Sequence, residues 1–424
     1  MTSERNQEFL GLFLVITLLL FGFALVTLTL TRELPQEIFA LPGALAALFF
    51  FGHLAMRLWV PKSDPFFLPI VSCLISLGLI MIYRLKPELV LVQVLWIGVG
   101  TFALITTLMF FRNYNELENY KYIFAIFGLL LLLSPIFVGK EVHGAKLWLK
   151  FGSFSFQPSE VAKILIVIFL AAYLKEKGEL LSLSRWKRWK ISLPEPKHWG
   201  PLLTMWLISL AILIFQKDLG SSLLFFGLFL GMLYIATGRV TYVLIGLGLF
   251  LAGAASCYYL FPHVATRVDV WIDPWVDVAG RGYQIVQSLF AISSGGLAGS
   301  GLGKGFPQTI PAVHTDFIFS ALAEETGFFG AAGVIVLYLL LTYRGLRLSL
   351  SASDGFGELL ASGLTTVFGL QTLVIIGGVT KAIPLTGVTL PFMSYGGSSI
   401  LSNFILLGLL LAVSQKTATG GESG

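Results

Sequence analysis

Long apolar stretches alternate with short polar segments along almost the whole chain. Most stretches have about the twenty residues that an α-helix needs to cross the hydrocarbon core of a bilayer. The pattern therefore predicts an all-α polytopic membrane protein with about twelve spanning helices and both termini on the same side. The predicted helices cover residues 9–30, 37–57, 67–83, 90–111, 122–138, 159–174, 200–216, 219–237, 240–260, 316–343, 357–379 and 390–414.

The composition supports a membrane protein and argues against several other classes. Of the 424 residues, 56% are hydrophobic and only 12% are charged, whereas soluble domains carry about a quarter charged residues. The first apolar run, Leu10–Leu30, is too long for the core of a signal peptide, so we expect it to be retained. The net charge is +5, and no soluble domain carries a basic patch interleaved with aromatic residues, which argues against nucleic acid as a partner. Cys73 and Cys257 lie in apolar runs without a zinc or redox spacing.

The densest group of basic residues lies between residues 175 and 199. Cytoplasmic loops of membrane proteins are enriched in Lys and Arg, so we place this loop and both termini in the cytoplasm. An ordinary topology determinant that also touches anionic lipid explains the group without a specific binding role. The same assignment puts residues 139–158, 261–315 and 380–389 on the outer side. The basic residues are Lys175, Lys177, Arg185, Lys187, Arg188, Lys190 and Lys197.

The outer segment 261–315 is far longer than a simple connection, and long loops usually carry function. Within it, Tyr283–Ile292 places apolar residues at helical spacing opposite two glutamines and a serine. This spacing predicts a short amphipathic helix at the membrane interface. The segment collects seven polar residues of interest, which are Arg267, Asp269, Asp273, Asp277, Arg281, Lys304 and His314.

Two clusters of polar residues lie at the starts of predicted helices, and ionisable residues at membrane depth are candidates for function by default. Glu160 and Lys163, three residues apart, lie on one helix face. They form either an ion pair that holds the helix in register or part of a catalytic cavity. Asp218, which follows Lys217, is either a helix cap or part of a polar cavity with the serines after it.

Further candidates lie in or beside the outer segments. Asp273 precedes a proline and is typical of a turn. Asp277 comes just before a flexible glycine pair and the amphipathic helix, so it could be presented over the membrane surface, although composition alone favours an ordinary solvated loop carboxylate. The run Gly299–Gly305 is not a Walker motif, because no Ser or Thr follows its Gly-Lys pair, but a backbone nest for a diphosphate stays open. The adjacent carboxylates of residues 324–325 favour a structural polar network. The small and hydroxylic run 391–399 favours close helix packing, with the lining of a headgroup cavity as the alternative.

Taken in this order, the clusters resemble the SEDS family of bacterial shape, elongation, division and sporulation proteins, whose members include RodA, FtsW and SpoVE. The resemblance covers about residues 67–414, and one departure is Lys217, where the family usually has proline. It rests on Gly144-Ala145-Lys146, Gln157-Pro158-Ser159-Glu160, Asp218-Leu219-Gly220, Asp277 with Gly282-Tyr283-Gln284, His314-Thr315-Asp316-Phe317, Glu324-Glu325-x-Gly327 and Pro391-Phe392-x-Ser394-Tyr395-Gly396-Gly397-Ser398-Ser399.

The resemblance implies a ten-helix core, so we expect residues 1–60 to be an added pair of N-terminal helices and residues 61–424 to be the core. Residues 261–315 would then be the outer catalytic loop and residues 415–424 a cytoplasmic tail. The family implies a peptidoglycan glycosyltransferase of the bacterial cytoplasmic membrane that polymerises lipid II, the undecaprenyl-pyrophosphoryl disaccharide-peptide, by a single inverting displacement. It also implies a class B penicillin-binding protein as the crosslinking partner.

Carried onto this sequence, the essential outer aspartate of the family is Asp277. As a general base it would take the proton of the attacking sugar hydroxyl. The leaving diphosphate needs either Lys or Arg side chains or a divalent cation, Mg²⁺ or Mn²⁺, and both remain open. A supporting substrate cavity is expected from Ser159, Glu160, Lys163, Lys217, Asp218, Arg267, Gln284, His314, Asp316, Lys381, Ser394, Tyr395, Ser398 and Ser399.

Two other functions compete with this interpretation. A flippase or transporter of lipid-linked precursors would also combine many spans with intramembrane charges. Such transporters usually have related halves, however, and no matching pair of polar motifs occurs in the two halves here. A scaffold that only recruits the penicillin-binding protein would leave the clustered carboxylates unexplained. The motifs do not separate an elongation (RodA-like) role from a division (FtsW-like) role.

Overall fold

The computed structural model describes residues 2–35, 39–142, 145–151, 154–182, 186–188, 191–193 and 196–420. These residues form two compact units, and the chain passes between them more than once. The first unit consists of Met1–Arg112, Thr266–Arg344 and Gln371–Gly424, and the second consists of Asn113–Ala265 and Gly345–Leu370.

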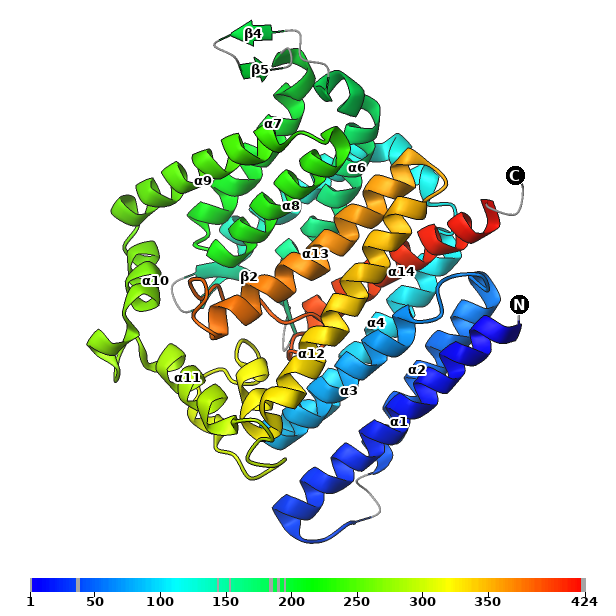
Figure 1. Ribbon diagram of the computed structural model, residues 1–424, viewed down its shortest axis with the longest axis vertical. Helices are drawn as coiled ribbons and strands as arrows, with labels where there is room; N and C mark the ends of the chain where they lie inside the picture. Colours follow the sequence, from blue (N-terminus) through cyan, green and yellow to red (C-terminus); the bar gives the residue numbers. More distant parts are fainter. Residues whose placement is uncertain are drawn as a thin grey trace. The chain divides into compact units, whose positions relative to one another are not determined.

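The first unit is a bundle of long helices with shorter helices in its outer segment (Figure 1). Its helices are α1 (Thr2–Thr31), α2 (Ala40–Trp59), α3 (Phe67–Leu85), α4 (Val90–Phe110), α11 (Tyr283–Gly295) and α14 (Gly397–Gly420), with most of α10 (Pro262–Ile272) and α12 (Ile318–Ser351) and the end of α13 (Gly355–Val379). Helix α1 packs on α3, α2 on α4, and α4 on α14. The α4–α14 contact is close because Gly100 has no side chain: a Cβ there would lie 2.3 Å from the ring of Phe404.

The second unit combines helices with two small sheets. Helix α5 (Lys121–Val138) packs on α6 (Pro158–Ser182), and α8 (Leu219–Thr237) packs on both α6 and α7 (Pro196–Phe215). Helix α9 (Val240–Leu260) exposes almost all of its apolar side chains, as expected of a helix that faces lipid. Strands β1 (Lys140–Val142), β2 (Ala145–Phe151) and β3 (Phe154–Phe156) form an antiparallel sheet in that order, and β4 (Trp186–Arg188) pairs with β5 (Ile191–Leu193).

The predicted fold class is confirmed, since each predicted span overlaps a helix of the structure. Among the described residues, ten helices are long and apolar enough to cross a membrane. Of the remaining two, α6 carries charged residues at both ends, and the apolar part of α7 covers only Leu202–Phe215. Five features of the prediction fall outside the described residues: the first two residues of the span 37–57, Gly144, the basic residues Arg185 and Lys190, and the end of the tail at 421–424.

Three local predictions differ from the structure. The last helix was expected to begin at residue 390, but α14 begins at Gly397. The residues before it form turns, because Phe392 has a left-handed backbone with φ of 65° and Pro391 lacks an N–H. Helix α14 then continues to Gly420, so residues 415–420 of the expected tail are helical. The sheet β1–β3 replaces what the sequence indicated only as an outer loop.

Helix α12 is broken at Gly327, whose backbone has φ of 68° and ψ of −165°. A side chain would not fit there, because a Cβ on Gly327 would lie 2.3 Å from the backbone nitrogen of Gly299. The glycine-rich loop, residues 295–305, supplies partners for the interrupted backbone. The N–H of Phe328, for example, donates to the carbonyl of Gly296 at 2.9 Å. Backbone polar groups at membrane depth need such partners within the protein.

The two adjacent carboxylates before the break fasten the same glycine-rich loop. Glu325 accepts the N–H of Gly303 at 2.9 Å and Nε of Arg84 at 3.0 Å. Glu324 accepts the N–H of Phe306 at 2.7 Å. The predicted polar network of Glu324 and Glu325 is therefore confirmed. The N–H of Gly303 is donated to this network, so it is not turned outward as part of an anion nest.

We expect Gly327→Ala to lower the free energy of unfolding by about 2 kcal/mol or more, because the alanine would be held at positive φ against backbone atoms. The apparent melting temperature of the purified protein in detergent measures this effect. Gly333→Ala is the matched control in the same helix, since the space around Gly333 is open. An equal loss of stability in both variants would contradict the assignment of the break.

Candidate functional site

The outer segment before α12 folds into short elements that position its charged residues. After α10, Asp273 caps the 3₁₀ turn η4 (Pro274–Asp277) by accepting the backbone N–H of Trp275 at 3.0 Å. Pro274 suits the first position of this turn, where an N–H is not needed. Helix α11 follows, so the predicted helix over Tyr283–Ile292 is confirmed. Its faces differ from the prediction, because Ser288, expected on the polar side, is buried and hydrogen-bonds with Ser320 and the carbonyl of Val379. Phe290, expected on the apolar side, is 52% exposed.

Asp277 ends the turn η4 and faces the start of α11. Its Oδ2 accepts the backbone N–H of Arg281 at 3.1 Å and lies 3.4 Å from Nε of the same residue. The turn is tight, because a Cβ on Gly282 would lie 2.2 Å from the carbonyl oxygen of Pro274. The backbone N–H of Arg281, helped by its side chain, lowers the pKa of Asp277 below the usual value. The carboxylate is therefore ionised at neutral pH, and its side chain is 43% exposed.

Asp277 lines a cavity of about 270 Å³, which we call the acidic hollow. Three carboxylates, those of Asp269, Asp273 and Asp277, line it together with the guanidinium of Arg281. The hollow thus carries more negative than positive charge, and Arg281 is the cation closest to Asp277 in sequence and in space.

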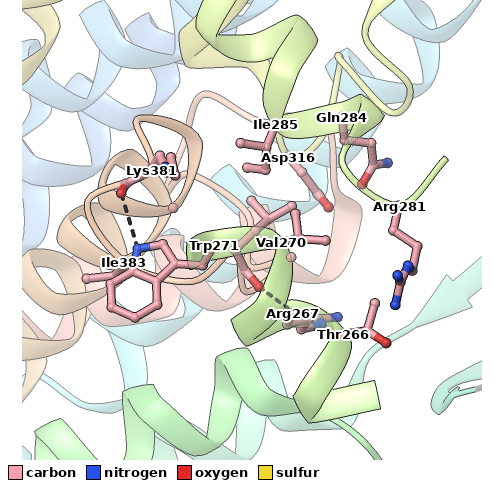
Figure 2. A pocket seen from close by; sticks show the side chains of 13 residues that line it. Thr266, Arg267, Val270, Trp271, Arg281, Gln284, Ile285, Asp316, Lys381 and Ile383 are labelled. Carbon is pink, nitrogen blue, oxygen red and sulfur yellow. Dashed lines mark hydrogen bonds between the residues drawn. The ribbon is translucent and has the colours of Figure 1, made fainter. Parts of the chain in front are cut away.

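A second cavity of about 170 Å³, the cationic pocket, lies between α10, the start of α11 and the segment 378–387 (Figure 2). Its charged lining residues are Arg267, Arg281, Lys381 and Asp316, so positive charge dominates. Gln284 adds an uncharged polar group. The structure thus brings together four residues of the predicted cavity, Arg267, Gln284, Asp316 and Lys381, and adds Arg281.

Two side chains of α10 clamp it to the segment after α13. Nη1 of Arg267 donates to the carbonyl oxygens of Leu385 and Thr386, each at 2.9 Å. Nε1 of Trp271 donates to the carbonyl of Lys381 at 3.2 Å. Lys381 itself has a left-handed backbone with φ of 62°, which turns its carbonyl out of a regular helix. Arg267 therefore holds the pocket wall through backbone contacts.

A third group of predicted residues lies together, but not in the cationic pocket. Oγ of Ser394 donates to the carbonyl of Thr315 at 2.5 Å, and the N–H of Tyr395 donates to the carbonyl of His314 at 3.0 Å. The rings of His314 and Tyr395 have centroids 5.8 Å apart. Burial, followed by the charge of Lys86, lowers the pKa of His314, so its imidazole is neutral at pH 7.

Two further predicted serines, Ser398 and Ser399, are buried at the start of α14. Ser398 is 2% exposed. Oγ of Ser399 accepts the hydroxyl of Thr389 at 2.9 Å. Both positions agree with the close packing that the sequence favoured for this run.

The other predicted residues belong to the second unit. Nζ of Lys163 donates to Oε2 of Glu160 at 2.6 Å, and both side chains are largely buried, as is Ser159. Oδ1 of Asp218 accepts the N–H of Ser221 at 2.9 Å, so Asp218 is the N-cap of α8. Lys217, the departure from the family pattern, has a left-handed backbone with φ of 64°. The ion pair considered for Glu160 and Lys163 is therefore present, and so is the helix cap considered for Asp218.

The predicted cavity residues did not include two members of the site, Arg281 and Trp271, although Arg281 was noted among the charged residues of the segment 261–315. Arg281 follows Asp277 by four residues, and this spacing was a readable signal for a pair at the start of a helix. Trp271 gave no signal, because its partner Lys381 is far away in the sequence. In the part of the chain that the structure describes, no group of three His, Cys, Asp or Glu side chains is arranged to hold a metal ion.

Comparison with known proteins places the chain among cell-wall enzymes. A family model described as "Cell cycle protein", built for FtsW, RodA and SpoVE, matches residues 65–419. The peptidoglycan glycosyltransferase RodA of Mycobacterium tuberculosis is 41% identical over 97% of this chain and 91% of its own length. Stage V sporulation protein E of Bacillus subtilis is 33% identical over 84% of this chain and 98% of its own length.

Solved structures agree with this placement. RodA of Thermus thermophilus matches with a TM-score of 0.60 and 27% identity, covering 83% of this chain and 96% of that chain. A chain from a peptidoglycan synthase complex that coordinates polymerization and crosslinking matches with a TM-score of 0.70 and 29% identity, covering 84% of this chain and 98% of that chain.

Fold, outer site and relatives together define a multi-pass membrane glycosyltransferase of peptidoglycan synthesis. The chain belongs to the FtsW/RodA/SpoVE family. The predicted family, fold class and enzyme class are thus confirmed.

The clamp on α10 gives a stability prediction. We expect Arg267→Met to lower the free energy of unfolding by about 2 kcal/mol, because the carbonyls of Leu385 and Thr386 lose a charged donor. Arg281→Met is the matched control from the same pocket: its side chain is 59% exposed, and a change of about 0.5 kcal/mol or less is expected. Apparent melting temperatures in detergent would test both, and equal destabilisation would refute the clamp.

Proposed function

We propose that the chain polymerises lipid II into glycan strands at the outer face of the cytoplasmic membrane, with Asp277 as the general base. The observation that carries the proposal is the position of Asp277. This ionised and partly exposed carboxylate lines the acidic hollow. Among the described residues, Arg281 is the one charged residue that lines both the acidic hollow and the cationic pocket, so it links Asp277 to that pocket. A base beside a site for a diphosphate is the arrangement that the reaction needs.

In the proposed reaction, the 4-hydroxyl of the acceptor sugar attacks the anomeric carbon of the donor sugar. The new bond joins this oxygen to the anomeric carbon, and the bond from that carbon to the diphosphate oxygen breaks. Asp277 accepts the hydroxyl proton. The undecaprenyl diphosphate leaves with the bonding electron pair, and a single displacement inverts the anomeric centre. No second carboxylate is required, since a diphosphate is already a good leaving group.

The cationic pocket is the proposed site of the leaving diphosphate. Arg281 and Lys381 bring positive charge to it, and Arg267 keeps its wall in place. Positive charge brought to the place where negative charge develops lowers the barrier to departure of the diphosphate. A Mg²⁺ or Mn²⁺ ion bound to the diphosphate is the alternative source of positive charge that the sequence leaves open.

The other predicted residues have supporting roles in the proposal. The ion pair of Glu160 and Lys163 and the cap at Asp218 keep the outer starts of α6 and α8 polar and ordered. Ser394 and Tyr395 hold the backbone next to His314, ahead of α12.

We place both termini in the cytoplasm, because the basic loop 175–199 favours that side. We also propose a class B penicillin-binding protein as the partner, on the strength of the similarity to a chain of a peptidoglycan synthase complex. A RodA-like role is supported by the match to RodA, which is 41% identical over 97% of the chain, whereas FtsW proteins are 32% identical over 84% and 36% identical over 72%. Residues 1–60 remain a proposed addition to a core of residues 61–424, and the family match begins at residue 65.

We expect Asp277→Asn to reduce lipid II polymerisation by about 100-fold or more, the usual contribution of a general base. Asparagine can still accept the N–H of Arg281, so expression and melting temperature should not change. The assay uses purified lipid II and a crosslinking partner that has no polymerase domain, with glycan strands resolved on gels. Asp273→Asn removes the same charge from the same hollow and keeps its capping oxygen, so it should retain polymerisation.

Full polymerisation by Asp277→Asn would show that Asp277 is not the general base, and Asp218 and Glu160 would be the next candidates to test. If the wild-type chain made no strands with its partner, a lipid II translocation assay in vesicles would test the flippase interpretation.

The lowered pKa of Asp277 also predicts the pH dependence. A general base works when deprotonated, so a pKa below the usual range moves the acid limb of kcat/KM to low pH. We therefore expect polymerisation to show no loss caused by Asp277 between about pH 5.5 and pH 8. Initial rates at limiting lipid II would measure the profile. An acid limb near pH 6.5 that Asp277→Glu displaces would contradict this assignment.

A further inference from the structure

Arg281 is the charged residue that the two outer cavities share. It lines the acidic hollow beside Asp277 and the cationic pocket beside Arg267 and Lys381. Its Nε lies 3.4 Å from Oδ2 of Asp277, which is long for a charged hydrogen bond, and its side chain is 59% exposed. An exposed pair of this kind is weak and easily exchanged for another partner.

We propose that Arg281 is a positioning residue that alternates between two anions. It pairs with Asp277 while the cationic pocket holds no ligand, and it turns to the diphosphate of a lipid-linked donor when that group enters. The inference rests on the proposed function and adds to it a link between donor binding and the general base.

The backbone lets the guanidinium leave without disturbing the base. The N–H of Arg281 itself donates to the same Oδ2 of Asp277 at 3.1 Å, and the N–H of Gly282 donates to the carbonyl of Asp277 at 3.0 Å. These contacts stay when the side chain rotates. Asp277 therefore keeps its place while the charge beside it moves.

Arg281 is better suited to this movement than the other cations of the pocket. Arg267 is engaged with two backbone carbonyls, and Lys381 lies in the segment that Trp271 holds. In Figure 2, Arg281 lies across the pocket from Lys381, so the two can approach a ligand from opposite sides. The planar guanidinium also binds two oxygens of a phosphate at once, which an ammonium does not.

The charges facing Arg281 favour the exchange. In the cationic pocket, Arg267, Arg281 and Lys381 face one carboxylate, Asp316, so an entering dianion meets excess positive charge. In the acidic hollow, Asp269 and Asp273 accompany Asp277. Once Arg281 leaves, Asp277 has lost a cationic neighbour and binds a proton more tightly. The base is thus strengthened when the donor is in place.

A binding cycle tests the exchange without turnover. The full-length chain in nanodiscs of zwitterionic lipid would be titrated with farnesyl diphosphate as the probe. If Asp277 and the diphosphate compete for Arg281, Asp277→Asn should tighten binding by about twofold to fivefold, the worth of an exposed ion pair. Arg281→Gln should weaken binding by about tenfold or more, the worth of a charged hydrogen bond. The double variant Asp277→Asn/Arg281→Gln should bind like Arg281→Gln, with the gain abolished.

Two controls separate the exchange from a general effect of charge. Asp273→Asn removes one negative charge from the same hollow and should tighten binding less than Asp277→Asn does. Arg281→Lys keeps the charge and should recover part of the affinity. In polymerisation assays, Arg281→Gln should raise KM for lipid II more than it lowers kcat, because in this variant Asp277 is not paired with an arginine even before the donor binds.

The inference is overturned if the gain from Asp277→Asn persists in the double variant, or if Arg281→Gln binds the probe like wild type. Its failure can be told from failure of the proposed function. The binding cycle does not depend on catalysis, whereas loss of the function would appear as full polymerisation by Asp277→Asn with the cycle intact.

Discussion

The segment that leads into helix α12 depends on the need to give every buried backbone polar group a partner within the chain. Helix α12 is broken at Gly327, and the broken ends must find partners within the chain. The glycine-rich loop, residues 295–305, supplies them, and Glu325 closes the arrangement by accepting from Gly303 and from Arg84 of α3. Burying the carboxylates of Glu324 and Glu325 costs less free energy because each of them accepts hydrogen bonds. The run Gly299–Gly305, which resembles a phosphate loop in sequence, therefore has a structural role. It fixes the C-terminal end of the segment 261–315 to helix α12.

The other end of the outer segment is fixed by a different device. Arg267 and Trp271 of α10 donate to backbone carbonyls of residues 381–386, and these contacts hold α10 against the segment after α13. Between the two fixed ends lie η4 and the start of α11, where Asp277 and Arg281 keep exposed side chains. Fixed ends with exposed charged side chains between them suit a site that must hold a carboxylate in place and still admit a large lipid-linked ligand.

Features that depend on local pattern could be predicted from the sequence, and features that depend on distant contacts could not. Helix length and hydropathy located the spans, and apolar spacing located the amphipathic helix that became α11. The start of α14 was placed too early, because apolar composition does not reveal the left-handed backbone of Phe392. The partner of Glu325 lies 241 residues away at Arg84, and no local rule joins such positions. Within the site, the resemblance supplied Asp277, and the four-residue spacing from Asp277 could have supplied Arg281. The clamp of Trp271 on Lys381 became visible only in the structure.

The two arginines of the cationic pocket illustrate why residue type alone does not assign a role. Both carry a full positive charge and line the same cavity. Arg267 donates to two carbonyls, so moving it would leave those acceptors without their charged donor. Arg281 meets an exposed carboxylate that water can also solvate, so moving it costs little. The first side chain is therefore suited to building the wall of the pocket and the second to responding to what enters it. The partners of a charge, rather than the charge itself, decide which of the two tasks it can perform.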